Sequence, residues 1–246
     1  MLAELRDVFK TKKGVLIILS MLTLAISAYL NLITIKNVMI GSFAISFGTI
    51  FISFLPMMVG DILTECFGWK KGFIISSIAY TICLAFTLIM WGSTIIPGQV
   101  FPGEGDFTFF ATDAYNTLFA GSWILILASA IAYYIGIFFN CYIMGKLKDR
   151  AQVTGDNNWK LFGRFISSTV IGQTLDNAIF FLIPMAFSMW NFTYVWQQVT
   201  AAVVIEVVYE IILFALTASI VKKIIKMPEG LQIVVNDDHE VTNVIS

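Results

Sequence analysis

A carboxylate stands in the middle of a long apolar segment of this chain. The segment from Ser167 to Trp190 is long enough to cross a bilayer, and Asp176 lies near its middle, with Gln173 about one helical turn before it and Asn177 directly after it. An ionised carboxylate at the centre of a bilayer costs roughly 2.5–3.5 kcal/mol on lenient insertion scales, so such residues normally face a protein interior or a wet cavity. The pattern therefore indicates a solute pathway.

Two glutamates share one face of the last apolar segment. Glu206 and Glu210 are four residues apart, which places both carboxylates on the same side of a helix. Two ionised carboxylates repel in a medium of low dielectric, so we expect either that one is protonated or that a cation lies between them. The alternative is an ordinary pair at the membrane interface.

A second pair with this spacing, Asp61 and Glu65, lies at the end of the second apolar segment. As functional residues, these two acids would serve gating or energy coupling. The alternative is structural, because acidic side chains are common at a membrane interface and Glu65 has Lys70 and Lys71 nearby in the sequence for an ion pair.

Further polar residues lie within or beside the apolar segments. Lys36 follows Asn31 in the sequence YLNLITIK, and it either extends to the lipid headgroups or neutralises a buried carboxylate. Asn140 in the fourth segment is a candidate hydrogen-bonding residue of a solute site. Gly136 and Gly172 are expected to permit close contact between helices.

The fourth and fifth segments carry a short internal similarity. Residues 134–143 (YIGIFFNCYI) resemble residues 170–179 (VIGQTLDNAI), which gives Gly-x3-Asn in one and Gly-x3-Asp in the other. Internal repeats are common in transporters. A chance match is the alternative for so short a pattern.

The apolar residues are grouped in a way that positions these side chains inside a membrane. The chain is 58% hydrophobic and 13% charged, about half the charged fraction of a typical soluble domain. Runs of about 20 apolar residues match the length of a membrane-spanning helix. We therefore predict an all-α bundle of six transmembrane helices at Gly14–Ile35, Ser42–Val59, Phe73–Trp91, Gly121–Tyr142, Phe165–Trp190 and Val199–Val221.

The basic residues predict the orientation of the bundle. Of the 15 Lys and Arg, 14 lie in the two terminal tails and in the connections after the second and fourth segments, and Lys36 is the exception. Because cytoplasmic loops are enriched in Lys and Arg, we expect both termini in the cytoplasm. The predicted parts are an N-terminal tail (1–13), a membrane domain (14–221) and a C-terminal tail (222–246).

Residues 92–120 form a long connection that is rich in Gly, Pro and aromatic residues and has no Lys or Arg. It is expected to be an external cap on the bundle or, alternatively, a lid over the solute entrance. Cys66, Cys83 and Cys141 are expected to be free thiols.

The residue types argue against several classes of protein. The single histidine, His239, lies in the C-terminal tail, which gives no credible haem or zinc site. The chain has no P-loop and no set of residues for nucleophilic catalysis. We therefore expect no enzyme activity, no metal and no cofactor, and no basic-aromatic array suggests nucleic acid.

Two acidic motifs resemble those of the queuosine precursor transporter family, which belongs to the vitamin uptake transporters. The first is Asp-x3-Glu-x2-Gly after a segment that ends in proline, and the second combines two hydroxyl residues with Gly-Gln-x2-Asp-x3-Phe. The connection before Arg164 and the spacing from Asn31 to Lys36 are also similar, so the resemblance spans roughly Leu30 to Leu216. The matching motif residues are Pro56, Asp61, Glu65 and Gly68, then Ser167, Ser168, Gly172, Gln173, Asp176 and Phe180, with Trp159 in the connection.

The chain departs from the family pattern at a few positions. The family often has Asp where Asn140 stands, commonly Gln at Ile137, Lys at Glu206 and a proline near Ala215. These departures change the charge of the expected cavity and leave the exact substrate open.

The resemblance implies a six-helix importer of a 7-deazaguanine such as preQ0, preQ1 or queuine. Asp176 or Glu210 would accept the ring N–H and the exocyclic amine together. Gln173, Asn177 or Asn140 would donate to the ring carbonyl, and Phe180 would stack on the flat face. Glu206 would favour a ligand that carries an amine, such as preQ1.

The mode of transport and the assembly stay open at this stage. We expect a secondary transporter in the inner membrane, coupled to protons or acting as a facilitator, whose partners are the lipid bilayer and the small-molecule base. A homodimer is one possible assembly. The alternative is a solute-binding membrane subunit of an ATP-driven vitamin uptake system.

Overall fold

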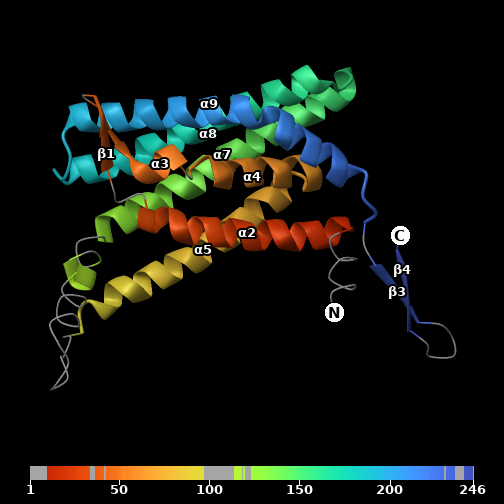
Figure 1. Ribbon diagram of the computed structural model, residues 1–246, viewed down its shortest axis with the longest axis horizontal. Coiled ribbons are helices and arrows are strands. Elements are labelled where there is room, and N and C mark those ends of the chain that lie inside the picture. The colour runs from red at the N-terminus through yellow and green to blue at the C-terminus, as the bar shows by residue number, and fades with distance from the viewer. Residues whose placement is uncertain are drawn as a thin grey trace.

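The protein folds as a bundle of long helices (Figure 1). The computed structural model describes residues 10–33, 37–41, 43–51, 53–96, 114–117, 119, 123–229, 231–235 and 241–245. The long helices are α2 (Lys12–Ile33), α5 (Trp69–Ser93), α7 (Trp123–Thr154), α8 (Asn158–Ala186) and α9 (Phe192–Ile225).

Four of these helices, α5, α7, α8 and α9, are long and apolar enough to cross a membrane. They correspond to the third to sixth predicted segments, and α2, with 22 residues, covers the first. The chain is thus a multi-pass membrane protein, although the structure does not confirm the count of six spans.

The second predicted segment is not one continuous helix. In place of Ser42–Val59, the chain forms a strand, the short helix α3 (Phe47–Phe51) and the helix α4 (Phe54–Phe67). Pro56 lies in the first turn of α4, where its missing N–H is tolerated, but its ring excludes a helix that continues from the preceding turn. The hydropathy of the segment hid this break, and discontinuous helices are typical of transporter interiors.

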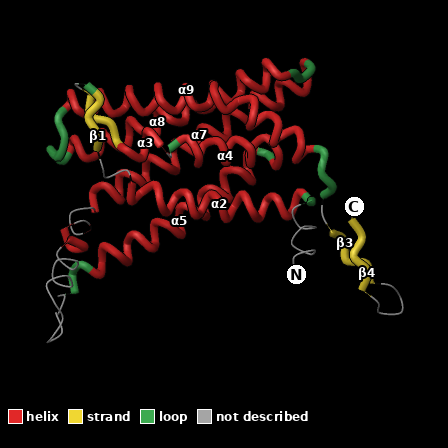
Figure 2. The backbone as a smooth tube through the Cα atoms, in the orientation of Figure 1, coloured by secondary structure: helices red, strands yellow, loops and turns green. Residues whose placement is uncertain are grey.

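The prediction of an all-α fold is also incomplete, because two small antiparallel hairpins are present (Figure 2). The first pairs β1 (Asn37–Ile40) with β2 (Phe43–Ser46), with Ile40 opposite Phe43. Gly41 in the turn has φ +63°, a conformation that two-residue hairpin turns require and glycine adopts without strain. The second pairs β3 (Leu231–Val235) with β4 (Val241–Ile245) in the C-terminal tail.

The basic segments meet at one end of the bundle. The backbone N–H of Lys12 donates to the carbonyl of Pro228 (2.9 Å), which joins the start of α2 to the residues after α9. The Lys222 ammonium donates to the Asn158 side chain (2.8 Å) and joins the end of α9 to the start of α8. Figure 1 shows these ends on the right. By the charge rule this end faces the cytoplasm, and that orientation stays a prediction.

A cluster of buried apolar side chains holds the same end of the bundle together. It comes from α2, α4, α7, α8 and α9 and includes Leu63, Met144 and Phe165, all with no exposed surface. By contrast, the outward faces of α5 and α9 expose large apolar side chains such as Ile78 (56%) and Ile212 (67%), as expected for surfaces in contact with lipid.

Most of the long connection 92–120 lies outside the described residues, so its predicted role as a cap or lid stays a prediction. Within its described part, the Tyr115 hydroxyl lies 2.7 Å from the Ser93 hydroxyl and 3.1 Å from the carbonyl of Met90. Residue 115 therefore packs against the end of α5.

Candidate functional site

The helices α7 and α8 cross in close contact at two glycines, Gly136 and Gly172. A Cβ atom at Gly136 would lie 2.7 Å from the Cβ of Asp176, and a Cβ at Gly172 would lie 2.8 Å from the Cβ of Asn140. The backbone oxygen of each glycine lies 3.1 Å from the position that a Cβ atom on the other glycine would occupy. The predicted role of both glycines is therefore confirmed.

The crossing also gives the internal similarity a structural meaning. The two similar segments pack against each other reciprocally, because the glycine of each meets the polar residue of the other. Asn140 and Asp176 consequently lie on opposite sides of the crossing and contribute to different polar regions of the interior.

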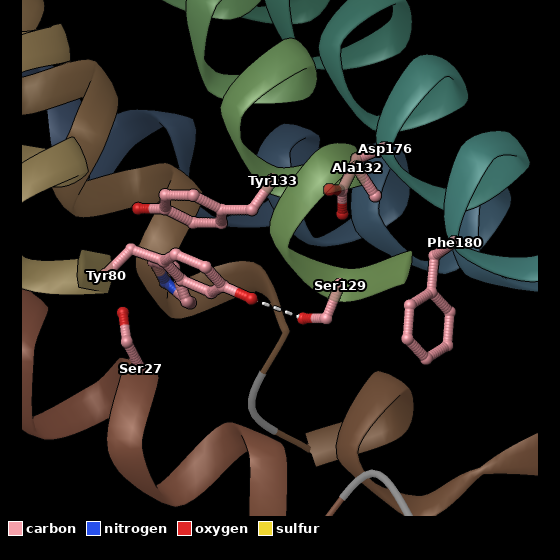
Figure 3. Close-up of a pocket in the computed structure, with 8 residues that line it drawn as sticks. Ser27, Tyr80, Ser129, Ala132, Tyr133, Asp176 and Phe180 are labelled. Carbon is pink, nitrogen blue, oxygen red and sulfur yellow. Dashed lines mark hydrogen bonds between the residues drawn. The ribbon is translucent and has the colours of Figure 1, made fainter. Parts of the chain in front are cut away.

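On one side of the crossing, Asp176 lines a small cavity, which we call the Tyr80 cavity. Its volume is about 80 Å³. The helices α2, α4, α5, α7 and α8 all contribute to its walls (Figure 3). The lining residues are Ser27, Pro56, Tyr80, Ser129, Ala132, Tyr133, Asp176 and Phe180.

Two stacked tyrosines form an aromatic wall of the Tyr80 cavity. The ring centroids of Tyr80 and Tyr133 are 4.1 Å apart and their planes differ by 12°. The Tyr80 hydroxyl lies 2.6 Å from the Ser129 hydroxyl, as Figure 3 shows, and the Tyr133 hydroxyl donates to the carbonyl of Ser76 (3.3 Å). These bonds fix both rings, whereas the buried Ser27 hydroxyl has no hydrogen-bond partner among the described residues.

Sequence reasoning found Asp176 and Phe180 in this cavity but missed the tyrosines and serines. Tyrosine in membrane proteins is enriched at the interfaces. The positions of Tyr80 and Tyr133 inside apolar segments were therefore a sequence signal that could have marked them as site residues. The serines gave no signal, because a single hydroxyl within a helix can bond to its own backbone.

Gln173, Asn177 and Glu206 form a hydrogen-bonded group next to the cavity. The Asn177 amide donates to the backbone carbonyl (3.0 Å) and side-chain oxygen (3.4 Å) of Gln173 and to the Glu206 carboxylate (3.3 Å). None of the three lines the Tyr80 cavity, so their predicted contact with solute stays a prediction.

On the other side of the crossing lies what we call the Asp61 cluster. Asp61 is completely buried and accepts hydrogen bonds from the Asn140 amide (2.9 Å) and the Thr169 hydroxyl (3.5 Å). Glu210, 6% exposed, lies on α9, which packs against α4, near enough to Asp61 for the two carboxyl groups to interact. The structure thus joins Asn140, predicted as a solute ligand, to Asp61, predicted as a coupling residue, with Glu210 near them.

Glu65 belongs to a separate ion-pair network, which we call the Arg164 network. Arg164, 2% exposed, pairs with Glu65 (3.0 Å) and with Asp156 (2.9 Å), and the Lys148 ammonium lies 3.7 Å from the Glu65 carboxylate. Lys148 also donates to the backbone carbonyl of Glu65. The expected ion pair with Lys70 or Lys71 is therefore wrong, because the partners of Glu65 come from α7 and α8.

The remaining predicted site residues lie at the edge of the described structure. Asn31 belongs to α2, but its side chain is outside the described residues, and so are Lys36 and His239. The described residues contain no group of three or more His, Cys, Asp or Glu suited to a metal ion. Cys66, Cys83 and Cys141 are free thiols, as predicted.

Most of this polar interior lies in a segment that matches a known protein family. A family model described as "Putative vitamin uptake transporter" matches residues 46–221, which include α4, the α7–α8 crossing and both glutamates of α9. The chain belongs to the vitamin uptake transporter family. The resemblance to the queuosine precursor and vitamin uptake group is thereby confirmed. Searches of curated proteins and of solved structures found no match.

Family membership identifies the chain as a membrane transporter of the vitamin uptake group and points to a non-enzyme. A transporter of this kind binds a small-molecule substrate within a lipid bilayer. The Tyr80 cavity lies among the long helices of the bundle and joins a carboxylate to aromatic walls, so it is the candidate substrate site.

The glycine crossing can be tested with a matched pair of substitutions in α8. Gly172→Ala places a methyl group against the Asn140 Cβ and should lower the free energy of unfolding by about 1–3 kcal/mol through overpacking. At Gly163 an added Cβ meets nothing within 4 Å, so Gly163→Ala should leave stability unchanged or slightly raised. Thermal unfolding of the purified variants measures the difference, and equal melting temperatures would contradict the close contact.

The Arg164 network predicts a pH-dependent contribution to stability. Asp156 lies in the connection between α7 and α8, where hydrogen bonds from the Arg164 guanidinium lower the pKa of its carboxyl group. Its stabilising contribution is therefore complete above the unfolded value of about 3.9 and is lost as pH falls through the lower folded pKa.

The corresponding measurement compares the melting temperatures of the wild type and Asp156→Asn across pH. The gap between them should be constant from neutral pH to about pH 5 and should narrow below about pH 4. Asp149→Asn, at an exposed position of α7, serves as the control. A gap that widens on acidification would show that Asp156 does not act through Arg164.

Proposed function

We propose that this protein imports a queuosine precursor, a 7-deazaguanine base, across the inner membrane, with both termini in the cytoplasm. The observation that carries the proposal is the Tyr80 cavity, where the Asp176 carboxylate and a fixed aromatic wall line the same space. Family membership supports the class of activity, and the two acidic motifs support the choice of cargo.

The residues of the cavity match the chemistry of such a base. A deazaguanine presents its ring N–H and exocyclic amine side by side, which suits a carboxylate that accepts two parallel hydrogen bonds. The flat ring can stack on Phe180 or on the tyrosine pair, as bases generally do on aromatic side chains. The Ser27 hydroxyl, which has no hydrogen-bond partner among the residues that the structure describes, is available to donate to the ring carbonyl.

Transport requires a conformation with a larger cavity. The volume of about 80 Å³ is well below the 300–1,000 Å³ usual for small-molecule sites. We therefore assign this structure to a closed state that opens when helices move around the crossing. The break between α3 and α4 is suited to such a movement, because Pro56 lies beside it and also lines the cavity.

The test is uptake of radiolabelled preQ1 and preQ0 by cells that lack their own importer and precursor synthesis. Hydrogen bonds to a charged group are worth about 1.5–3 kcal/mol, so Asp176→Asn should reduce uptake by about tenfold or more. Glu206→Gln should weaken uptake of preQ1 more than uptake of preQ0. Asp149→Asn controls for the same chemical change at an exposed position.

The outcomes separate the proposal from its rivals. Normal uptake by well-expressed Asp176→Asn would exclude Asp176 as a ligand. No uptake by the wild-type chain in cells, or uptake that is absent from liposomes containing the purified chain alone, would favour another solute or a binding subunit of an ATP-driven system.

A further inference from the structure

We propose that the Asp61 cluster is a binding site for a monovalent cation of the sodium type, separate from the Tyr80 cavity. Four helices meet there, with Asp61 from α4, Asn140 from α7, Thr169 from α8 and Glu210 from α9. The site stands on its own contacts, and only its role in driving transport rests on the proposed function.

Charge balance is the first argument for a bound cation. Asp61 and Glu210 are more than nine-tenths buried, and the hydrogen-bond donors to Asp61, Asn140 and Thr169, are neutral. Among the described residues, the nearby bases Arg164 and Lys148 are instead engaged with Glu65, one turn further along α4. Two buried carboxylates that have no base beside them in the described part of the chain carry a large desolvation cost unless positive charge joins them.

Unsatisfied oxygen atoms are the second, independent argument. Asn140 is completely buried and its amide contacts Asp61 directly, yet its Oδ1 has no hydrogen-bond partner among the described residues. The Oε1 atom of Glu210 is unpartnered in the same way. Buried polar atoms are nearly always satisfied, so two such acceptors at one cluster indicate a missing electropositive partner.

The ligand atoms decide the class of that partner. The carboxylates of Asp61 and Glu210, the Asn140 carbonyl and the Thr169 hydroxyl are all oxygen donors, which suit hard cations and not soft transition metals. Calcium sites usually need six to eight oxygens. The four side chains carry six, and both oxygens of Asp61 already accept hydrogen bonds, so the set falls short of a calcium site. A small monovalent cation can contact several of these oxygens at once, and the experiment below distinguishes it from a proton on either carboxyl group.

A cation bound in the Asp61 cluster would affect solute binding through the positions of the helices. Asn140 and Asp176 lie on opposite sides of the Gly136–Gly172 contact, so a cation at Asp61 lies across the crossing from the solute cavity. It would draw α4 and α9 together beside the break that precedes α4. The inferred cation therefore acts through helix position and not by direct contact with the base.

The test is thermal unfolding of the purified full-length chain in sodium, potassium or choline chloride at constant ionic strength and pH. Sodium should raise the melting temperature in a saturable manner by about 3 °C. Asp61→Asn should abolish the sodium effect, and Asp149→Asn should keep it. Thr169→Val, which retains both carboxylates, should raise the half-saturating sodium concentration by about tenfold and covers the case in which Asp61→Asn does not fold.

The possible outcomes test the cation site and the proposed function separately. Identical melting curves in the three salts, or a sodium effect that survives both substitutions, would overturn the site. Stability that responds to pH but not to the cation would mean that the carboxylates share a proton, which also overturns it. A sodium effect with no uptake of preQ1 into liposomes under a sodium gradient would leave the site standing and reject the proposed function.

Discussion

The close approach of α7 and α8 at Gly136 and Gly172 is the contact on which the rest of the interior depends. Without side chains at these two positions, the backbones come near enough for each glycine to meet a polar residue of the other helix. The crossing therefore turns Asn140 toward α4 and leaves Asp176 beside the tyrosines of the cavity. Any residue larger than glycine would separate the helices and displace both polar groups.

The buried side chains become more polar from the Tyr80 cavity through the Asp61 cluster to the Arg164 network. Most of the Tyr80 cavity is aromatic or hydroxylic, with one carboxylate among the eight lining residues. The Asp61 cluster has two acids and neutral donors, and the Arg164 network pairs acids with bases at the basic end of the molecule. The acids of the Arg164 network are paired with bases, whereas Asp61 accepts its hydrogen bonds from neutral groups.

Hydropathy and helical spacing predicted correctly those elements whose sequence carries a single strong pattern. Runs of apolar residues located α5, α7, α8 and α9, and glycine spacing predicted the crossing. The break before α4 was missed because an apolar run masks a proline within it. The strand β2 was missed for the same reason, because it lies inside the apolar segment Ser42–Val59, whereas β3 and β4 lie in the C-terminal tail, where no strand was expected.

Partnerships between distant residues were the least predictable part of the site. Glu65 was assigned to its neighbours Lys70 and Lys71, but its partner Arg164 lies 99 positions away. The Asp61–Asn140 and Tyr80–Ser129 contacts likewise join different helices. Such pairs depend on how each helix is rotated about its axis, and hydropathy constrains that rotation only weakly when a helix is apolar on all sides.

In the proposed function, the Tyr80 cavity holds the base and Asp176 recognises it. Calorimetric titration of preQ1 into the purified chain tests this most directly, because it needs no gradient and no transport step. We predict saturable binding by the wild type and affinity weaker by about tenfold or more for folded Asp176→Asn. Equal affinity in both proteins, or no binding of preQ1 by the folded wild type, would contradict the account.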